Sequence, residues 1–363
     1  MSTPSIKKYY LCLIRKELSG ILPEILRQML YLLSKIYGFS IKTRIFFYRK
    51  GILKTYRLPV PVISVGNITT GGTGKTPVVE YLAKYAGKKG KRVIIISRGY
   101  APMMQQGKDA ASSEMCNDEH LLFKENIPGI MNILGKDRVK SGWEAINRRQ
   151  AECLLLDDGF QHLRLSRDMD IVLIDTLEPF GYEYTLPRGL LREPLEGLRR
   201  SDLFLLTHTD QISQEKKQTI IDRLREIARD VPVIESIHKP VRLVLAADEK
   251  SFGTEWLAGK KVFAFCAIGN PLSFRKSLES LGAILVGFHE FPDHHAYTPS
   301  DLHILNGEAR GASPDAIVIT QKDRVKLGKD IARWTLPVVT LKMEICITKG
   351  SEILHKKLDE KLN

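Results

Sequence analysis

The sequence has few cysteines, no long apolar run and no low-complexity tract, and each shortage excludes a class of protein. Its five cysteines are scattered over 363 residues without a C-x-x-C pair. That spacing argues against a disulfide framework and a zinc site, and it favours a reducing compartment. No apolar segment approaches the roughly 20 residues needed to span a bilayer. A cleavable signal peptide is not expected, because Arg15, Lys16 and Glu17 interrupt the early apolar residues.

Acidic residues are scarce in the first 60 positions, which contain twelve lysines and arginines but only two glutamates. Most of the net charge of +13 therefore lies in this segment, and the rest of the chain is nearly balanced. Apolar residues recur at helical spacing from Ile21 to Tyr37, and basic residues bracket a second apolar group, Ile45 to Tyr48. Such a helix can lie on a membrane surface, or it can pack its apolar face on the protein's own core. Because the charge lies beside apolar side chains, a membrane is the expected partner and nucleic acid is not.

A glycine-rich stretch from Gly66 to Pro77 follows an apolar run, Val60 to Val65, and precedes a helical pattern, Pro77 to Lys89. A strand, a glycine-rich turn and a helix in this order indicate a loop whose backbone N–H groups bind phosphates. The first glycine of the usual G-x-x-x-x-G-K-[ST] spacing is replaced by Thr69. Lys75 would reach the outer phosphates of ATP, and Thr76 would place its hydroxyl on Mg²⁺. The nucleotide-binding residues are then Gly71, Gly72, Thr73, Gly74, Lys75 and Thr76.

Strand-like runs alternate with helical ones in the rest of the chain, which predicts a parallel α/β sheet with helices on both faces, similar to P-loop NTPases. Strands are expected at residues 60–65, 93–97, 153–156, 171–175, 203–207 and 231–234, and a smaller second α/β unit has strands at 261–268, 284–288, 316–320 and 337–341. The stretch Val231 to Val241, with its two prolines, reads as a hinge. We therefore expect a membrane-associating segment at 1–58, a P-loop domain at 59–236 and a C-terminal α/β domain at 237–363.

Ligands of parallel sheets bind at the carboxyl ends of the strands, so the residues that follow each strand are the candidates for a site. Asp157 and Asp158 follow one strand, and Asp175 ends the next. Paired acids at a strand end can be Mg²⁺ ligands or helix caps, and the phosphate loop in the same sheet favours the metal role. His294 and His295 follow a later strand beside Asp293 and could serve as proton acceptors or form a solvated turn. Thr320 to Asp323 is similar to the guanine-reading loop of GTPases, although a charged turn explains it as well.

Taken together, these motifs resemble those of the tetraacyldisaccharide 4'-kinases of lipid A biosynthesis over nearly the whole chain. The resemblance rests on the following segments: residues 64–77, Ser97–Tyr100, Asp157–His162, Leu191–Pro194, Phe291–His295 and Gln321–Asp323. Thr69 is normal for this family. The resemblance implies transfer of the γ-phosphate of ATP to the 4'-hydroxyl of a tetraacyldisaccharide 1-phosphate, which gives lipid IVA. It also implies a peripheral enzyme at the cytoplasmic face of the bacterial inner membrane, and nothing requires more than a monomer.

Site residues are also implied by the resemblance. Asp118 matches the catalytic aspartate and His294 its partner, although His295 is the alternative partner. The family's Gly-Asp-Glu-Pro is Asn117-Asp118-Glu119-His120 here, so the local turn must differ. The Mg²⁺ ligands are expected among Thr76, Asp157, Asp158 and Glu193. Contacts to the substrate or transition state are expected from Glu119, Arg138, Gln161, His162 and Arg192.

A competing interpretation from another class is a membrane-recruited P-loop switch whose nucleotide state controls a partner protein. Such a switch would hydrolyse ATP or GTP without a lipid acceptor. The paired Asp118 and His294 would have no role in it.

Overall fold

The computed structural model describes residues 6–98, 118–293 and 295–362. The first six strands are β1 (Val62–Asn67), β2 (Val93–Ser97), β3 (Met131–Leu134), β4 (Cys153–Asp157), β5 (Met169–Asp175) and β6 (Leu203–Thr207). The remaining strands are β7 (Val233–Leu245), β8 (Ser251–Phe252), β9 (Lys261–Cys266), β10 (Ile284–Glu290), β11 (Ala316–Thr320) and β12 (Val338–Lys349).

The α-helices are α1 (Ile6–Ile14), α2 (Ile21–Arg49), α3 (Lys75–Lys88), α4 (Asp118–Asn126), α5 (Arg138–Arg149), α6 (Gln214–Ile227), α7 (Pro271–Ser280), α8 (Pro299–Ala312), α9 (Gln321–Leu327) and α10 (Ser351–Leu362). Short 3₁₀ helices span Gly181–Glu183, Leu195–Arg200, Thr209–Gln211, Thr254–Leu257 and Gly328–Arg333.

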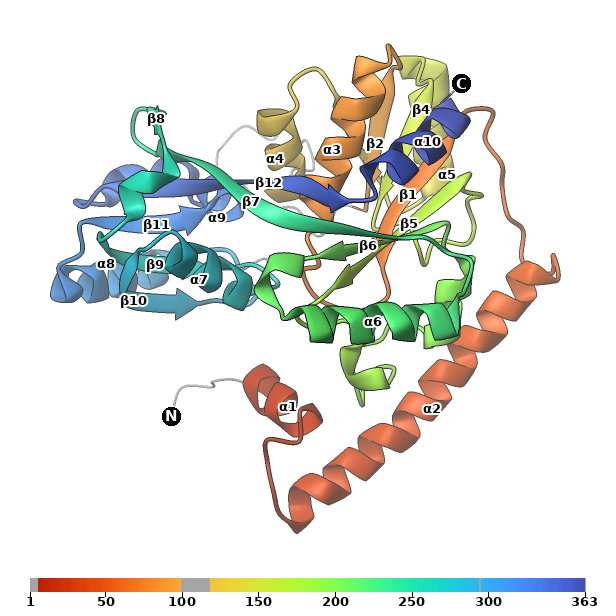
Figure 1. The fold of residues 1–363 in the computed structure, drawn as a ribbon, viewed down its shortest axis with the longest axis horizontal. Helices are drawn as coiled ribbons and strands as arrows, with labels where there is room; N and C mark the ends of the chain where they lie inside the picture. Colours follow the sequence, from red (N-terminus) through yellow and green to blue (C-terminus); the bar gives the residue numbers. More distant parts are fainter. Residues whose placement is uncertain (1–5, 99–117, 294, 363) are drawn as a thin grey trace.

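All strands belong to one sheet, in the order β10-β9-β11-β12-β7-β6-β5-β1-β4-β2-β3, with β8 attached to β7 (Figure 1). Neighbouring strands are parallel except where β7 runs antiparallel to β12 and β8. Helices cover both faces, as the alternating pattern of the sequence predicts. The predicted α/β fold with a mostly parallel sheet is confirmed.

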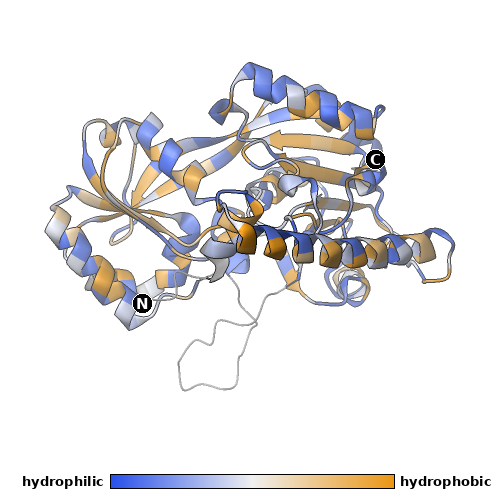
Figure 2. Cartoon of the chain, turned by 90° about the horizontal axis from the view of Figure 1, so that it is seen from below, coloured by the Kyte–Doolittle hydropathy of each residue, from blue (hydrophilic) through white to orange (hydrophobic). Residues whose placement is uncertain are grey.

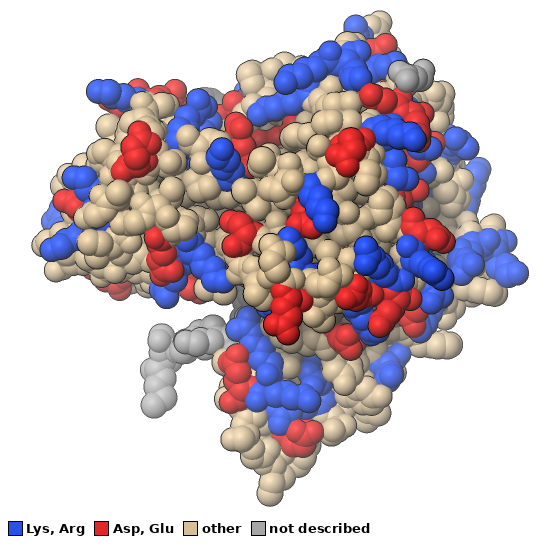
Figure 3. Space-filling model, viewed as in Figure 1, with Lys and Arg blue, Asp and Glu red and all other residues tan. Residues whose placement is uncertain are grey.

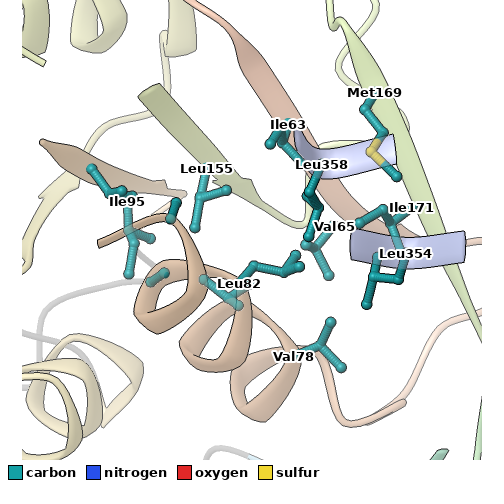
Figure 4. Close-up of a cluster of buried hydrophobic side chains, with 14 of the residues drawn as sticks. Ile63, Val65, Val78, Leu82, Ile95, Leu155, Met169, Ile171, Leu354 and Leu358 are labelled. Atoms are coloured by element: carbon teal, nitrogen blue, oxygen red, sulfur yellow. The ribbon is translucent and has the colours of Figure 1, made fainter. Parts of the chain in front are cut away.

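The core of the first half sets the position of α3. Val78 and Leu82 of α3 and Leu354 and Leu358 of α10 pack on one face of the central strands, against residues such as Val65 (Figure 4). Each fully buried side chain of this size stabilises the fold by about 1.5–3 kcal/mol. The central strands are buried on both faces, which is why they read as continuous apolar runs in the sequence. This packing holds the N-terminus of α3 at the carboxyl end of β1.

The stretch predicted as a hinge, Val231 to Val241, is mostly strand. β7 pairs with β6 at its start and then with β12 over ten residues, through a register shift near Pro240. The two halves of the molecule therefore share one sheet, because β7 passes from one to the other (Figure 1). The predicted boundary at residues 236 and 237 falls inside this strand. The division into three domains stays a prediction.

Helix α2 begins at the predicted residue but continues to Arg49, so it includes the second apolar group. The residues it buries are Arg27, Ser34 and Gly38, and the hydroxyl of Thr185 donates to the carbonyl of Ser34 at 2.8 Å. Apolar (orange) and polar (blue) residues alternate along the helix (Figure 2). Ten of its large apolar side chains are exposed: Ile21, Leu22, Ile25, Met29, Leu32, Leu33, Ile36, Phe39, Phe46 and Phe47. The helix therefore packs its small and polar face on the protein and leaves its apolar face open.

No helix in the described part of the chain is both long enough and apolar enough to cross a bilayer.

Candidate active site

The loop between β1 and α3 has the backbone of a phosphate-binding turn. Its positive φ angles fall at Gly71 (119°) and at Gly74 (77°), where glycine avoids the steric cost of a side chain. Thr69 needs no such freedom, because it forms an antiparallel bridge with Leu191 instead. The replacement of the first glycine by Thr69 therefore costs the loop nothing. Gly74 caps α3, so Lys75 and Thr76 start the helix at its positive end.

Lys75 is already part of a polar network at this helix end. Its ammonium donates to Asn67 Oδ1 at 3.2 Å and lies 3.5 Å from Asp158 Oδ1. Arg192 Nη1 donates to both carboxylate oxygens of Asp158 at 2.8 Å. Burial opposes ionisation of Asp158, but Lys75 and Arg192 outweigh it and lower its pKa to about 2. Asp158 therefore holds the two cations that the sequence predicts for phosphate binding.

The neighbouring Asp157, at the end of β4, has a different environment. Its Oδ1 is buried and has no hydrogen-bond partner among the described residues. Burial and the nearby charge of Glu119 raise the pKa of Asp157 to about 7, against the opposing effect of Lys75. An unpaired, buried carboxylate oxygen beside a phosphate loop fits an Mg²⁺ ligand, since Mg²⁺ in such sites needs only one or two protein oxygens besides phosphates and water. The described residues include no group of three or more His, Cys, Asp or Glu side chains that could hold a metal ion.

Glu193 and Gln161 lie behind the loop. Glu193 is 1% exposed and pairs with Arg200 Nη2 at 2.8 Å. Gln161 Nε2 donates to Glu193 Oε1 at 3.0 Å and to the carbonyl of Asn67 at 2.9 Å. This chain of contacts ties Glu193 to the loop through Gln161. A direct bond from Glu193 to Mg²⁺ stays a prediction.

Arg138 and His162 support the end of β4. Buried Arg138 donates to the carbonyls of Gly135 at 2.6 Å and Asp157 at 3.1 Å. Burial and the charge of Arg138 lower the pKa of His162 to about 4, so its ring is neutral at physiological pH. The assignment of both residues to the substrate stays a prediction.

Asp118 and Glu119 begin α4 on the far side of the loop. Asp118 is buried, accepts a hydrogen bond from the backbone of Glu119 at 3.1 Å and lies 3.8 Å from Lys326 of α9. Glu119 lies 3.7 Å from Lys322, also of α9. The expected partner His294 is outside the described residues. His295 Nε2 lies 3.0 Å from Asp301, so that ring already has a carboxylate.

A cavity of about 470 Å³ lies beside the phosphate loop, with walls from both halves of the molecule. Five of the described residues that were predicted for the site do not line it: Asp118, Arg138, Gln161, His162 and Glu193. The predicted residues that line it are Gly71, Gly72, Thr73, Gly74, Lys75, Thr76, Asp157, Asp158, Glu119 and Arg192. The C-terminal half contributes Gly269, Asn270, Asp293 and Lys322, among others. The two halves touch where Gly72 meets Gly269, since a side-chain carbon on either glycine would collide with the backbone of the other. The structure thus brings the phosphate loop, the paired acids and Glu119 to one space.

One cluster at this cavity was not predicted from the sequence as a site. His208 Nδ1 lies 3.0 Å from Asp175 Oδ1, and Asn270 Nδ2 donates to Asp175 Oδ2 at 2.9 Å. The ring of His208 stacks on that of His238 at 4.4 Å between centroids, and His238 fills the space beside Gly74. Burial lowers the pKa of His238 to about 3. The rule that predicted Asp157 also applies to Asp175 and His208, because both follow parallel strands.

Comparisons with known proteins agree with this geometry. A family model described as tetraacyldisaccharide-1-P 4'-kinase matches residues 26–363. A tetraacyldisaccharide 4'-kinase of Syntrophus aciditrophicus is 39% identical over 348 residues, which are 91% of this chain and 92% of that relative. One from Halothermothrix orenii is 38% identical over 343 residues, or 90% and 89% of the two chains. A crystal structure of LpxK from Aquifex aeolicus in complex with ATP has a TM-score of 0.69 and 32% identity, and the match covers 93% of this chain and 100% of that one.

Proposed function

The chain belongs to the family of tetraacyldisaccharide-1-P 4'-kinases and phosphorylates the 4'-hydroxyl of a tetraacyldisaccharide 1-phosphate with ATP, and we propose that the cavity between its two halves is the site of this transfer. The product is lipid IVA of lipid A biosynthesis. One observation carries the proposal. Lys75 of the phosphate loop, Asp157 with its unpaired oxygen and Glu119 of α4 border one cavity, and Asp118 precedes Glu119 at the start of that helix, so donor and acceptor groups can meet there.

Phosphoryl transfer needs positioning and charge neutralisation more than covalent work by the protein. In our proposal the loop N–H groups and Lys75 hold the β- and γ-phosphates, and Thr76 and Asp157 hold Mg²⁺. The bound Mg²⁺ neutralises charge on the phosphates. Arg192 contributes positive charge from the side of Asp158. The bond between the γ-phosphorus and its bridging oxygen breaks towards ADP as the 4'-oxygen bonds to the phosphorus.

Asp118 is the proposed acceptor of the 4'-hydroxyl proton, with His294 as its partner. Its carboxylate begins α4 and lies 3.8 Å from the ammonium of Lys326. The neighbouring Glu119 lines the cavity and pairs with Lys322, so the start of α4 is held against α9. This contact supports a base at the junction of the two halves.

The apolar face of α2 is proposed to lie on the cytoplasmic surface of the inner membrane, where the acylated substrate is found. The face has no protein partner among the described residues, and basic side chains gather where the helix ends (Figure 3). Arg49, Lys50 and Lys54 are exposed there. Each such charge contributes about 1 kcal/mol near an anionic membrane. A link to the cavity supports the proposal, because Tyr37 of α2 donates its hydroxyl to the carbonyl of Arg192 at 2.8 Å.

The function is tested by phosphate transfer to tetraacyldisaccharide 1-phosphate in mixed micelles with the variants Asp118→Asn and Glu125→Gln. General-base catalysis contributes about 10²–10⁴-fold, so Asp118→Asn should lose turnover in that range while ATP still binds. Glu125 lies on the same helix and also pairs with the second half, through Arg324 at 2.8 Å, so Glu125→Gln controls for the helix contact. Equal turnover in Asp118→Asn and wild type would overturn the assignment of the base.

The same assay separates a kinase from a nucleotide-dependent switch. A kinase should consume ATP only slowly until the acylated acceptor is added. Rapid hydrolysis without acceptor, together with no phosphorylated lipid, would contradict the proposal and favour the switch.

A further inference from the structure

Lys322 belongs to the charged segment Thr320 to Asp323, which the proposed mechanism does not use. Asp323 is fully buried and accepts hydrogen bonds from Tyr297 at 2.9 Å and from the backbone of Ala267 at 2.9 Å. Its own backbone N–H donates to Thr320 Oγ1, which caps α9. Asp323 is therefore a structural residue rather than a reader of a nucleotide base. Its role is to fix the first turn of α9, where Lys322 lies.

Lys322 reaches the cavity from the C-terminal half, opposite the phosphate loop. It lines the same space as Lys75 and Asp157, and its ammonium lies 3.7 Å from Glu119. Burial would lower the pKa of Lys322, but Glu119, Asp118 and Asp293 outweigh burial and raise it, so the side chain stays charged. A charged lysine side chain that is only 21% exposed and faces a phosphate site destabilises the fold unless an anionic partner compensates for its lost hydration.

Two other cations that line the cavity are held on the loop side. Lys75 and Arg192 both contact Asp158, which holds them beside the β1–α3 turn. During transfer, charge is spread over the three equatorial oxygens of the phosphoryl group, which leaves the nucleotide and approaches the acceptor. A cation on the side of the acceptor base would stabilise the phosphoryl group while it is between donor and acceptor. Lys322 is on that side, because it pairs with Glu119, the residue that follows Asp118.

We propose that Lys322 is a catalytic cation that binds the γ-phosphoryl oxygens during transfer, supplied by the half of the molecule that does not carry the phosphate loop. The inference rests on the proposed function. Lys322 keeps its three protons throughout. The electron pair of the broken bond goes to ADP, the 4'-oxygen bonds to phosphorus, and the hydroxyl proton goes to Asp118. The phosphoryl oxygens replace Glu119 as the partner of the ammonium.

The alternative role, a clamp between the halves, is already filled by neighbouring ion pairs. Arg324 of α9 lies 2.8 Å from Glu125 of α4, and Lys342 lies 3.3 Å from the same carboxylate. Arg324 is not among the residues that line the cavity. Arg324→Gln therefore removes a contact between the same two helices without changing the charge at the site, and it is a matched control for Lys322→Gln.

The experiment compares wild type, Lys322→Gln, Lys322→Arg and Arg324→Gln in the full chain. Turnover is measured with tetraacyldisaccharide 1-phosphate in mixed micelles, and equilibrium affinity is measured with Mg²⁺ for ADP alone and for ADP with aluminium fluoride, which imitates the phosphoryl group in transit. Thermal unfolding reports on folding. Loss of one preorganised donor to a transition state costs about 10²–10³-fold in kcat.

Lys322→Gln should lose kcat by about that factor and should lose affinity for ADP with aluminium fluoride, while its affinity for ADP and its Tm stay close to wild type. Lys322→Arg should recover part of the loss, and Arg324→Gln should stay within about threefold of wild type. The proposal is overturned if Lys322→Gln keeps wild-type kcat, if it loses ADP affinity equally, or if Arg324→Gln is impaired as much. A wild-type protein that phosphorylates no lipid would instead overturn the proposed function itself.

Discussion

Two adjacent carboxylates at the end of β4 show how neighbours decide the chemistry of a residue. Asp158 meets Lys75 and Arg192, and its pKa falls to about 2, whereas Asp157 is buried beside Glu119, and its pKa rises to about 7. The sequence predicts both as acids at a strand end but cannot tell them apart. The difference comes from Lys75 and Arg192 on one carboxylate and Glu119 on the other, all of them at least 34 positions away along the chain. It therefore depends on tertiary structure that no local pattern encodes.

The raised pKa of Asp157 predicts a dependence of stability on pH without Mg²⁺. Between the ordinary aspartate pKa of 3.8 and about 7, the unfolded chain loses this proton and the folded chain keeps it. The folded state therefore binds more protons, and stability falls as pH rises through that window. The variant Asp157→Asn cannot ionise, so it does not lose this stability. Each unit of pKa shift corresponds to about 1.4 kcal/mol of unfolding free energy.

Denaturant unfolding without Mg²⁺ should show Asp157→Asn more stable than wild type by at least about 1.4 kcal/mol at pH 7.5, and nearly equal to it at about pH 3, below the ordinary aspartate pKa. Added Mg²⁺ and ATP should stabilise wild type more than the variant. Asp158→Asn should have the opposite effect at pH 7.5, because it leaves Lys75 and Arg192 without their carboxylate. A difference between Asp157→Asn and wild type that is the same at both pH values would refute the interpretation.

At the scale of single elements, the sequence predicts the buried strands best. The strands at residues 93–97, 203–207 and 316–320 have the predicted bounds, because runs of buried apolar residues end in clear turns. The short strand β3 was missed, since its residues are partly exposed and its pattern is weak. β7 was cut short at Ile234, because Pro240 reads as a break. In the structure a register shift beside β12 accommodates that proline.

Helix α2 allows a direct test of the membrane proposal. The variant Ile25→Ser, Leu32→Ser, Ile36→Ser and Phe39→Ser removes four exposed apolar side chains from one face. Each buried CH₂ contributes about 0.8 kcal/mol to membrane binding, so sedimentation with anionic vesicles should fall at least tenfold. The Tm should change little, because these side chains are exposed.

Four serines at buried or half-buried apolar positions of another helix would impair folding, so they are not a suitable control. The control variant changes charge instead. Lys35→Gln and Lys50→Gln keep the apolar face, and they should weaken binding to anionic vesicles but not to neutral ones. Unchanged sedimentation of the four-serine variant would show that α2 does not attach the protein to lipid.

At the scale of the whole molecule, the shared sheet links the halves that form the cavity. The hydrogen bonds between β7 and β12 continue the sheet from one half to the other. Gly72 and Gly269 also contact each other across the site. The sequence predicts the two sets of strands but not their union, because pairing between β7 and β12 joins residues about 100 positions apart. The predicted site residues from the phosphate loop and β4 converge for a local reason: they follow neighbouring parallel strands.

One cooperative unfolding transition is therefore expected by calorimetry, in spite of a chain long enough for two domains. Mg²⁺ and ATP at 100 times the Kd should add about 2.7 kcal/mol of stability and move the whole transition upwards by a few degrees. Two transitions, of which nucleotide moves only one, would show that the halves unfold independently.

The open apolar face of α2 has a consequence for how the enzyme's rate should be expressed. If α2 lies on lipid, as proposed, enzyme and acceptor meet by diffusion in two dimensions rather than three. The velocity then follows the mole fraction of acceptor in the surface, so diluting the acceptor with inert lipid slows the reaction even when its bulk concentration is constant. Tyr37 of this helix donates a hydrogen bond to the carbonyl of Arg192, so binding of α2 to a bilayer would also fix the orientation of Arg192 and the phosphate loop relative to the membrane plane.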